Sequence, residues 1–441
     1  ACQFAGVIVT PLNWRAKPDE LDYCAIDAEA KAIVFEAASA QAVAASAACQ
    51  RLPRIALAGA DGGTHQFDAL LRATAPDAPI PVAIADDISV MLYTSGTTGK
   101  PKGVPRRHRA ERAGALAHVA QNLYAVGERT LGVMPLYHTM GVRSLLASAI
   151  IDGAFVAMPR FDASEAIALI ERERVTHLYL VPTLYHDLIG HSSFASSRVA
   201  TVRKLGFAGA PMHDALLVRL QAAFKPELFV NHYGSSEIYT FTINQSAALK
   251  PGSAGRAGFN ARVRVVKLDA GDKRATPSDL AATNEEGQII ADLAGDEAFE
   301  CYWKRPDADA KSLRDGWYFT GDTGYVDAEG DLFVTGRVDD MIISGGENIS
   351  PVDIESVLSL HPAVDEVAVA GLPDERWGQK VVAFIKAKAP VDAASLDEHC
   401  RRSDLANFKR PREYVIVRAI PKSPVGKILR RMLVAGEYER L

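Results

Sequence analysis

The sequence predicts an α/β protein with a large N-terminal domain and a small α+β C-terminal domain. With 441 residues, the chain is too long for one compact core. Up to about residue 245, short β-rich runs alternate with helical patterns, which predicts mainly parallel sheets covered by helices. From about residue 255, strand-like runs alternate with turn signals, and the pattern changes again near Asp339. We therefore expect domains at residues 1–338 and 339–441.

The alternating part supplies both kinds of element. Its β-rich runs are residues 30–37, 87–94, 176–182 and 227–234. Its helix candidates, with apolar residues at helical spacing, are residues 107–123, 163–173 and 213–224. In parallel sheets of this kind, ligands bind at the carboxyl ends of the strands, so we expect the functional residues there.

The later runs predict two smaller units. Residues 261–268, 287–293, 316–321 and 331–337 form strand patterns between turns, as in a small antiparallel β unit. Beyond Asp339, Ser350 resembles a helix cap followed by proline at the first helical position. Strands are expected at 365–372, 380–387 and 412–417, with a helix at 393–402, which makes a compact α+β domain.

Composition limits the classes of function. The net charge of −5 gives no general attraction to nucleic acid or to an acidic membrane, and no apolar run approaches the length of a membrane span. The five cysteines form no short-spaced pairs, so we expect reduced thiols and a cytoplasmic protein. Residues 6–12 resemble a buried strand without a basic region before it, so we expect a chain truncated at its start.

The most informative segment is the run YTSGTTGKPKG at residues 93–103. Its glycines allow backbone N–H groups to converge on one anion, while hydroxyls and lysines add donors and charge. The run follows a predicted strand, and we expect a helix after it. It does not match the GxxxxGK[ST] phosphate loop, because Pro101 stands five residues after Gly96, where that pattern has its second glycine. A solvated turn is the alternative interpretation, but so many hydroxyls, glycines and lysines favour a phosphate-binding loop.

Five further motifs follow in order along the chain. They are MPLYH (134–138), YGSSE (233–237), TGD (320–322), GRVDD (336–340) and PKSPVGK (421–427). With the glycine-rich run, they resemble the adenylate-forming superfamily of acyl- and aryl-CoA synthetases, adenylation domains and luciferases. The resemblance is greatest to benzoate- and 4-chlorobenzoate-type CoA ligases. It covers nearly the whole chain, although the family pattern also includes a segment before position 1.

The resemblance implies an ATP site. Phosphates would contact the loop, and Thr97 would act in catalysis. Asp322 would accept the ribose hydroxyls, since a carboxylate offers two acceptor oxygens, and Arg337 would contact ribose and phosphate. Glu237 would hold Mg²⁺, and two small-residue segments would enclose adenine. The nucleotide set is Thr94, Ser95, Gly96, Thr97, Thr98, Gly99, Lys102, Gly209, Ala210, Pro211, Asn231, His232, Tyr233, Gly234, Ser236, Asp322 and Arg337.

The family also divides its reaction between two arrangements of a mobile C-terminal domain. Lys427 would stabilise the charge that develops as a carboxylate attacks the α-phosphate. The domain would then turn about Asp339 and present a narrow channel to coenzyme A. Aromatic faces could stack on the CoA adenine and arginines could bind its phosphates. The expected CoA contacts are Arg15, Gly345, Gly346, Trp377, Phe408, Arg410 and Arg412.

The acid pocket is expected to be mixed apolar and aromatic, which suits a flat or compact acid. His138 would gate it, and the pocket set is His138, Thr139, Met140, Phe207, Ala208, Tyr239 and Thr240. The expected activity is an ATP-dependent carboxylate–CoA ligase with an aromatic, benzoate-type acid. The alternatives are a medium-chain fatty or alicyclic acid, a carrier-protein-loading adenylation enzyme, and a non-enzymatic binding protein of the same fold. If the chain assembles, we expect a homodimer.

Overall fold

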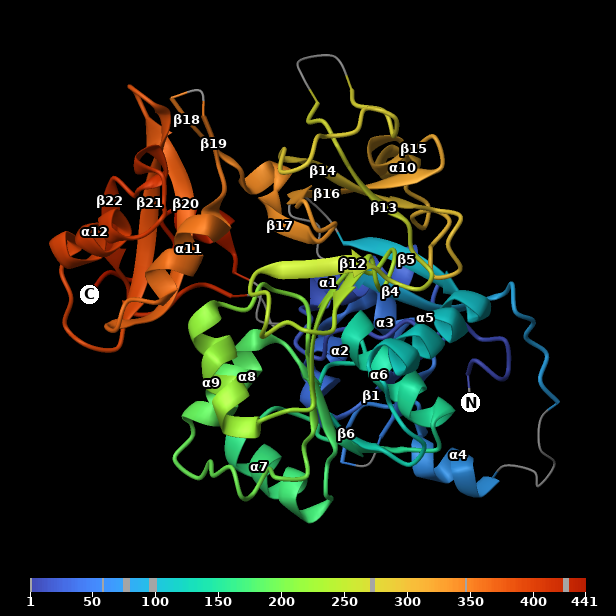
Figure 1. The fold of residues 1–441 in the computed structure, drawn as a ribbon. Helices are drawn as coiled ribbons and strands as arrows, with labels where there is room; N and C mark the ends of the chain where they lie inside the picture. Colours follow the sequence, from blue (N-terminus) through green and yellow to red (C-terminus); the bar gives the residue numbers. More distant parts are fainter. Residues whose placement is uncertain are drawn as a thin grey trace. The chain divides into compact units, whose positions relative to one another are not determined.

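The computed structural model describes residues 2–57, 59–73, 80–94, 101–269, 274–345, 347–422 and 428–441, without the side chains of Asp339 and Asn348. These residues form two compact units (Figure 1). The first comprises residues 1–112, 135–142 and 299–309, and the second comprises residues 113–134, 143–298 and 310–441. Among the described residues, no helix combines the length and apolar character that a membrane span requires.

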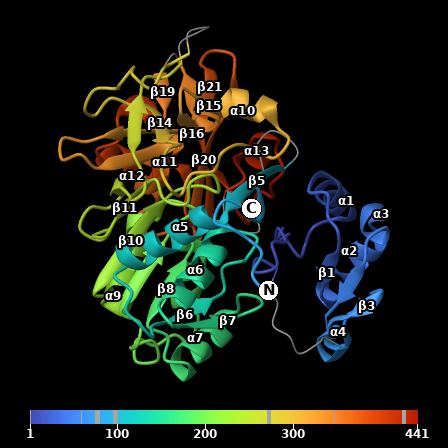
Figure 2. The ribbon, with the colours of Figure 1, turned by 90° about the vertical axis from the view of Figure 1, so that its right-hand side faces the viewer.

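The first unit begins with a small parallel sheet, around which α1–α4 gather (Figure 2). Its strands are β1 (Ile33–Phe35), β2 (Arg54–Ala56) and β3 (His65–Gln66). Its helices are α1 (Pro18–Asp27), η1 (Ala37–Ser39), α2 (Ala40–Ala45), α3 (Ala47–Gln50) and α4 (Phe67–Ala73). Leu21, Phe35 and Val43 are among the buried apolar residues that hold these elements together.

A second element of this unit is the antiparallel ribbon of β4 (Ile88–Thr94) and β5 (Lys102–Arg107). Thr94 pairs with Lys102, so the glycine-rich run connects two strands. The predicted strand–loop–helix order is therefore wrong, because β5 precedes the helix that starts at His108. The expected buried strand at residues 6–12 is also wrong. Only Val9 forms a bridge, to Val90, and Val7 is exposed.

The second unit contains one twelve-stranded sheet. Five parallel strands lie in the order β7-β6-β8-β9-β10, and antiparallel strands continue the sheet from β11 onward. The predicted antiparallel β unit is thus joined to the parallel part by hydrogen bonds. The strands are β6 (Arg129–Gly132), β7 (Ala154–Ala157), β8 (His177–Leu180), β9 (Lys204–Phe207), β10 (Leu228–Tyr233), β11 (Thr242–Asn244), β12 (Ser253–Ala257), β13 (Val263–Val266), β14 (Gly287–Asp292), β15 (Leu313–Arg314), β16 (Trp317–Val326) and β17 (Leu332–Arg337).

Helices cover both faces of the parallel part, as expected for an α/β sheet. In Figure 1, α5 and α6 lie on one side of β6, and α7–α9 lie on the other. Helix α7 buries Ile167 and Ile170 on one face, and Asp162 caps its start. These helices are α5 (His108–Gln121), α6 (Thr139–Ile150), α7 (Ala163–Arg172), α8 (Pro182–Gly190) and α9 (Asp214–Phe224). A further helix, α10 (Pro306–Ser312), directly precedes β15.

A separate five-stranded sheet follows residue 341, with apolar side chains buried on both faces. Along β21, Ala383 and Ile385 face one cluster and Val382 and Phe384 face the other, because side chains alternate along a strand. The strands are β18 (Ile342–Ser344), β19 (Glu347–Ile349), β20 (Val364–Asp374), β21 (Gly378–Ala387) and β22 (Glu413–Ile416). The helices are η2 (Val338–Asp340), α11 (Pro351–Ser359), α12 (Ala393–Arg402), η3 (Asn407–Lys409) and α13 (Arg430–Val434).

The second unit also buries a cluster of neutral histidines. Asn122 Nδ2 lies 3.0 Å from His118 Nδ1, and Asn122 Oδ1 lies 3.1 Å from His232 Nε2. Burial lowers the pKa of both rings well below the ordinary value, and the nearby Arg143 charge adds to this. Burial also lowers the pKa of His177 to about 3, although Glu128 lies 3.6 Å from its Nδ1. That carboxylate is already paired with Lys204.

These histidines predict acid-sensitive stability. Because the unfolded chain binds protons near pH 6.5 and the folded rings do not, the unfolding free energy should decrease as the pH falls below about 6.5. Three such groups give a slope of up to ~4 kcal/mol per pH unit. Denaturant unfolding at pH 7.5, 6.5 and 5.5 would measure it. His177→Phe, which keeps a ring beside Tyr124, should reduce the slope by ~1.4 kcal/mol per pH unit. An unchanged slope would contradict this explanation.

Candidate functional site

Two neighbouring parallel strands of the second unit end side by side. Phe207 at the end of β9 pairs with Asn231 near the end of β10. The tight segment Gly209-Ala210-Pro211 follows the first strand, and Tyr233-Gly234 ends the second. Gly209 has φ of 83°, a conformation that glycine adopts without strain. Both small-residue segments therefore lie at carboxyl strand ends, where α/β sheets bind ligands.

The position of the His232 side chain limits how this residue could contact a nucleotide. Asn231 and Tyr233 share one face of β10, and the intervening side chain points to the other face. The His232 ring is only 2% exposed and contacts Asn122 in the histidine cluster. A ligand on the Asn231 and Tyr233 face could therefore contact the backbone of His232 but not its side chain.

The carboxylate of Asp322, on β16 of the same sheet, lies between the phenol of Tyr233 and the guanidinium of Arg337. Tyr233 Oη donates to Asp322 Oδ2 at 2.6 Å, and Arg337 Nη1 lies 3.0 Å from Asp322 Oδ1. Asp322 and Arg337 are paired across β16 and β17. Gly321 has φ of 76°, and a Cβ atom there would come within 2.9 Å of Arg337 Nη2. The TGD glycine is thus needed for the close approach of Arg337.

This cluster retains capacity for a ligand. Arg337 Nε is buried and has no hydrogen-bond partner among the described residues. A buried donor without a partner is costly, so an oxygen acceptor at this point would be favourable. Tyr233 and Arg337 each contact one oxygen of Asp322, and a carboxylate can accept about four hydrogen bonds. The residues therefore fit a molecule that carries hydroxyl and phosphate oxygens.

The YGSSE segment folds back on itself after β10. Ser235 N donates to Ile238 O at 2.9 Å, and Phe241 N donates to Tyr233 O at 2.8 Å. A Cβ atom on Gly234 would lie 2.1 Å from the Tyr239 carbonyl oxygen, so only glycine fits. Glu237 is 5% exposed within this turn, next to Ser236. One carboxylate with bound phosphates is a common arrangement for Mg²⁺, so this residue fits the metal ligand that was expected.

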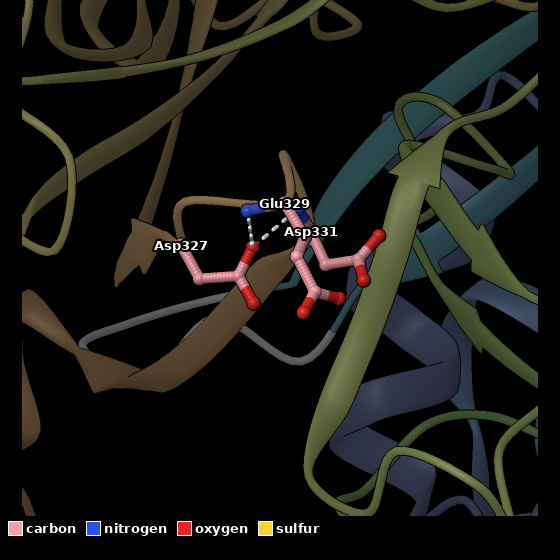
Figure 3. Close-up of side chains that lie close together, drawn as sticks. All are labelled: Asp327, Glu329 and Asp331. Atoms are coloured by element: carbon pink, nitrogen blue, oxygen red, sulfur yellow. Dashed lines mark hydrogen bonds between the residues drawn. The ribbon is translucent and has the colours of Figure 1, made fainter.

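The carboxylates that gather most closely among the described residues are Asp327, Glu329 and Asp331 (Figure 3). Lys250 Nζ lies 2.5, 2.9 and 2.6 Å from their oxygens, respectively. Hydrogen bonds to these acids raise the pKa of Lys250, and Lys250 in turn lowers the pKa of Asp327. Because the lysine already supplies the positive charge, the cluster is a structural ion-pair network.

Four residues of the expected acid pocket lie in the second unit. Phe207 ends β9 and Ala208 follows it, while Tyr239 and Thr240 precede β11. All four residues are buried. The Phe207 ring packs edge-on against Phe229 with 5.8 Å between ring centroids. These side chains are apolar or aromatic apart from one threonine hydroxyl, as the sequence predicts.

Sequence reasoning did not identify Arg143, a buried cation that contacts two of these residues. Arg143 is 2% exposed and donates from Nη1 to the Tyr239 carbonyl at 3.1 Å and to Thr240 Oγ1 at 2.5 Å. Its Nη2 contacts Tyr179 Oη. No carboxylate among the described residues forms an ion pair with it. A signal was present, because Arg143 is the one charged residue in the helical run TMGVRSLLASAI.

The first unit holds the remaining described members of these sets. His138 precedes α6, and its Nδ1 accepts from Met140 N at 3.4 Å, so it caps the helix that begins at Thr139. Met140 is 1% exposed. The ammonium group of Lys102 lies 3.9 Å from the centre of the Tyr302 ring. His138 and Lys102 are therefore both engaged in local contacts of this unit.

Several predicted residues cannot be assigned a geometry. The loop residues Ser95, Gly96, Thr97, Thr98 and Gly99 lie outside the described residues, as do Gly346 and Lys427, and the side chain of Asp339 is not described. Their roles remain predictions.

Three of the expected CoA contacts lie together in segments that flank strands of the C-terminal sheet. Gly345 N donates to Trp377 O at 2.8 Å, and the Arg412 guanidinium lies 4.1 Å from the Trp377 ring centre. Gly345 has φ of 64°, and a Cβ atom there would come within 2.8 Å of the tryptophan ring. Arg376, which the sequence interpretation omitted, lies 4.8 Å from the same ring. This cluster offers an aromatic face flanked by two cations.

The other three described residues of the expected CoA set have different neighbours. Phe408 is 45% exposed in η3, which leaves its ring available for stacking. Arg410 Nη1 lies 3.4 Å from Asp397, while its Nε is buried without a hydrogen-bond partner among the described residues. Arg15, in the first unit, lies with its guanidinium 4.4 Å from the Trp14 ring centre.

Comparison with known proteins gives a consistent result. The AMP-binding enzyme family matches residues 1–303, and the AMP-binding enzyme C-terminal domain matches residues 353–427. A 4-chlorobenzoate–CoA ligase of Arthrobacter is 37% identical over 79% of this chain and 66% of its own length, just under two thirds. A long-chain-fatty-acid–CoA ligase of Mycobacterium tuberculosis is 34% identical over 97% of this chain and 83% of its own.

Solved structures agree with the fold. An anthranilate CoA ligase in complex with anthranoyl-AMP superposes with a TM-score of 0.88 at 26% identity, covering 98% of this chain and 83% of its own. The predicted fold class is thereby confirmed, with its large mixed α/β part and its small C-terminal part. The matches span both parts of the chain and agree with the ordered motifs at the strand ends. This chain belongs to the family of AMP-binding, adenylate-forming enzymes.

Proposed function

We propose that this protein is an ATP-dependent carboxylate–CoA ligase. In the first step a carboxylate oxygen attacks the α-phosphorus of ATP, the bond to pyrophosphate breaks, and an acyl-adenylate forms. In the second step the CoA sulfur attacks the acyl carbon, and AMP leaves with the electron pair of the broken C–O bond. The family membership and the names of the relatives support this proposal.

The observation that carries the proposal is the Tyr233–Asp322–Arg337 cluster at the strand ends. It presents a carboxylate beside a guanidinium whose buried Nε has no hydrogen-bond partner among the described residues. That combination suits a ribose and its adjoining phosphate, as in AMP. Gly209-Ala210-Pro211 follows the neighbouring strand without bulky side chains, which suits the approach of an adenine ring.

Further residues complete the first step in this proposal. Glu237 would hold Mg²⁺, which when bound would neutralise charge on the nucleotide phosphates. The loop residues 94–100 with Lys102 would bind those phosphates. Lys427 would stabilise negative charge as the carboxylate attacks. His138 would gate the acid.

The second step would use the C-terminal residues 339–441, turning about Asp339. Trp377 supplies an aromatic face for the CoA adenine, and Arg412 lies against that ring, where its charge can meet phosphate. The exposed Phe408 ring supports the same role. Arg15, Gly345, Gly346 and Arg410 complete the proposed CoA set. We place the reaction in the cytoplasm, in keeping with five free cysteines.

A single test separates CoA from a carrier protein as the acyl acceptor. Purified enzyme is incubated with ATP, Mg²⁺ and acid, and with either free CoA or a phosphopantetheinyl carrier protein. We expect acyl-CoA and AMP in equal amounts with free CoA. Acylation of the carrier alone would favour the adenylation-enzyme alternative.

We also propose an aromatic acid. The buried Phe207 and Tyr239 support a compact pocket, and an aryl acid could bury most of its apolar surface there at about 25 cal/mol per Å². The names of the relatives include both an aromatic and a long-chain acid, so the choice between these acids rests on the pocket residues. A medium-chain fatty or alicyclic acid is the alternative.

The acid panel is benzoate, a para-substituted benzoate, cyclohexanecarboxylate, octanoate and palmitate. We expect the highest kcat/KM for an aryl acid, and Tyr239→Ala should shift preference toward longer or para-substituted acids, because it removes bulk from the pocket. If palmitate were the best substrate, the aryl assignment would be wrong. If octanoate were best, the medium-chain alternative would replace it.

Arg143 should act as a positioning residue for the acid. Arg143→Met removes the donors that hold the Tyr239 carbonyl and Thr240, so the KM for the acid should rise at least ~10-fold. The KM for ATP should change much less. Arg143→Lys, which keeps the charge, should recover part of the loss. If both KM values rose together, or only kcat fell, Arg143 would have a general structural role.

A further inference from the structure

A cavity of about 730 Å³ opens at the opposite ends of the same parallel strands. Arg129 begins β6, Arg203 immediately precedes β9, and Arg172 and Arg174 lie at the end of α7. Four guanidinium groups from three parts of the second unit therefore line one space. Its volume lies in the usual range for small-molecule sites, which is ~300–1,000 Å³.

The charges in this lining are not balanced. Glu173 is the only carboxylate among the lining residues, and it pairs with both Arg129 at 3.1 Å and Arg172 at 3.0 Å. The Arg203 Nε atom lies 3.9 Å from a Glu227 oxygen, which is long for an ion pair. Arg174 forms no ion pair within the described part of the chain. The lining thus carries an excess of three positive charges in a chain of net charge −5. A bound anion would balance this excess.

The donors lie on a rigid base. Thr176 Oγ1 accepts from Arg129 N at 2.9 Å and donates to Arg129 O at 3.1 Å, which fixes the start of β6 against β8. Thr201 Oγ1 donates to Val175 O at 2.8 Å. Arg129 Nε is buried without a hydrogen-bond partner among the described residues. A buried donor without a partner is costly, and it belongs to a residue that lines the cavity.

Arg174 occupies a position that usually takes glycine. Val175 N donates to Ile170 O and Arg174 N to Glu171 O, the bonds of a Schellman turn after α7. Arg174 has φ of 54° there, which is strained for a side chain with a Cβ atom. Cations are favoured at a helix carboxyl end, which accounts for Arg172 but not for Arg129 and Arg203 on the strands.

We propose that this cavity binds a phosphate-bearing small molecule of nucleotide size. Guanidinium forks match pairs of phosphate oxygens, and several arginines suit a diphosphate better than a single carboxylate. The site is separate from the proposed ATP site, because Gly209-Ala210-Pro211 and Tyr233 lie at the carboxyl ends of these strands. The inference stands apart from the proposed ligase activity.

The test uses the full chain, with inorganic pyrophosphate and ADP as separate probes in calorimetric titrations. Arg203→Gln and Arg174→Gly should each weaken binding at this site about tenfold, the expected loss for one charge-assisted contact. Arg174→Gly should fold at least as well as the wild type, since glycine accepts the turn without strain. Arg219→Gln, an exposed arginine on α9, is the matched control and should bind like the wild type.

The outcomes separate the interpretations. A larger loss of ADP binding than of pyrophosphate binding in the cavity variants would identify a nucleotide as the ligand of the cavity, and the reverse would identify a free diphosphate. Binding of both probes that neither cavity variant changes would overturn the proposal. So would binding of only an acidic polyglutamate peptide, which would mark a protein interface. Acid-dependent ATP–pyrophosphate exchange should be unchanged in both variants, and its parallel loss would contradict a separate site.

Discussion

Arg430→Met should lower the free energy of unfolding by roughly 3–5 kcal/mol, the cost of leaving a buried carboxylate without its cation. Glu355 is 1% exposed, and Arg430 Nη2 donates to its two oxygens at 2.6 and 2.8 Å. The same carboxylate accepts from Val369 N at 2.7 Å, and Arg430 Nε donates to Val369 O at 3.0 Å. One ion pair thus joins α11, β20 and α13.

Denaturant unfolding measured by circular dichroism would test this expectation. Arg431→Met is the matched control, because it removes an exposed charge from the same helix and should change stability by less than ~0.5 kcal/mol. The double variant Glu355→Leu with Arg430→Met should recover most of the loss, since it leaves no buried charge. Equal stability of Arg430→Met and the control would show that the pair contributes nothing.

Lys427→Ala should slow acyl-adenylate formation by ~10²–10³-fold, as for the loss of one preorganised charge in a catalytic site. It should leave the conversion of supplied acyl-adenylate and CoA nearly intact, because the second step develops no charge at that position in the proposed mechanism. Single-turnover assays of each half-reaction would measure the two effects. Arg430, three residues further on, donates to Val369 O in the C-terminal sheet, and its loss should also impair the first step more than the second.

Lys422→Ala supplies the control for that experiment. Lys422 belongs to the same PKSPVGK motif, but its ammonium lies 2.5 Å from Glu366 and so serves a local ion pair. Its replacement should leave both half-reactions close to the wild-type rates. Equal losses in both half-reactions of Lys427→Ala would refute the proposed division of labour between the steps.

Sequence patterns predicted the elements whose boundaries are set by local chemistry. The helix at 393–402 was predicted with its observed limits, because Asp392 accepts from Ser395 N and fixes the start. Strands 87–94 and 380–387 were also placed within a few residues. Periodicity and capping act within a few residues of the chain, so a sequence window contains them.

Other predictions failed because pairing partners are distant in the sequence. Apolar composition did not reveal that residues 6–12 form only one bridge, or that β5 follows the glycine-rich run. Ser350 was expected to cap α11, but its hydroxyl donates to Thr335 O across 15 residues. The family motifs predicted that Asp322 and Arg337 contact one nucleotide, and the structure pairs the two residues across neighbouring strands. The alternation along β10, which turns the His232 ring away from Asn231 and Tyr233, required the structure.

The role proposed for Arg143 could not be predicted for the same reason, because its partners are distant in the sequence. A single arginine in an apolar helix is visible in the sequence, but its partners Tyr179, Tyr239 and Thr240 lie 36 to 97 residues away. Only the folded chain shows that it holds the segment after Glu237. Likewise, the acids that resemble a metal site are neutralised by Lys250, which precedes them by some 80 residues.

The most direct test of the central claim is carboxylate-dependent exchange of labelled pyrophosphate into ATP, measured without CoA across the acid panel. Adenylation predicts exchange that requires both Mg²⁺ and an acid, is fastest with an aryl acid, and falls in Asp322→Asn at least ~10-fold through the lost acceptor. Adding CoA should convert the same acid to its thioester with release of AMP. Absence of acid-dependent exchange with every acid, in a folded enzyme, would contradict the assignment.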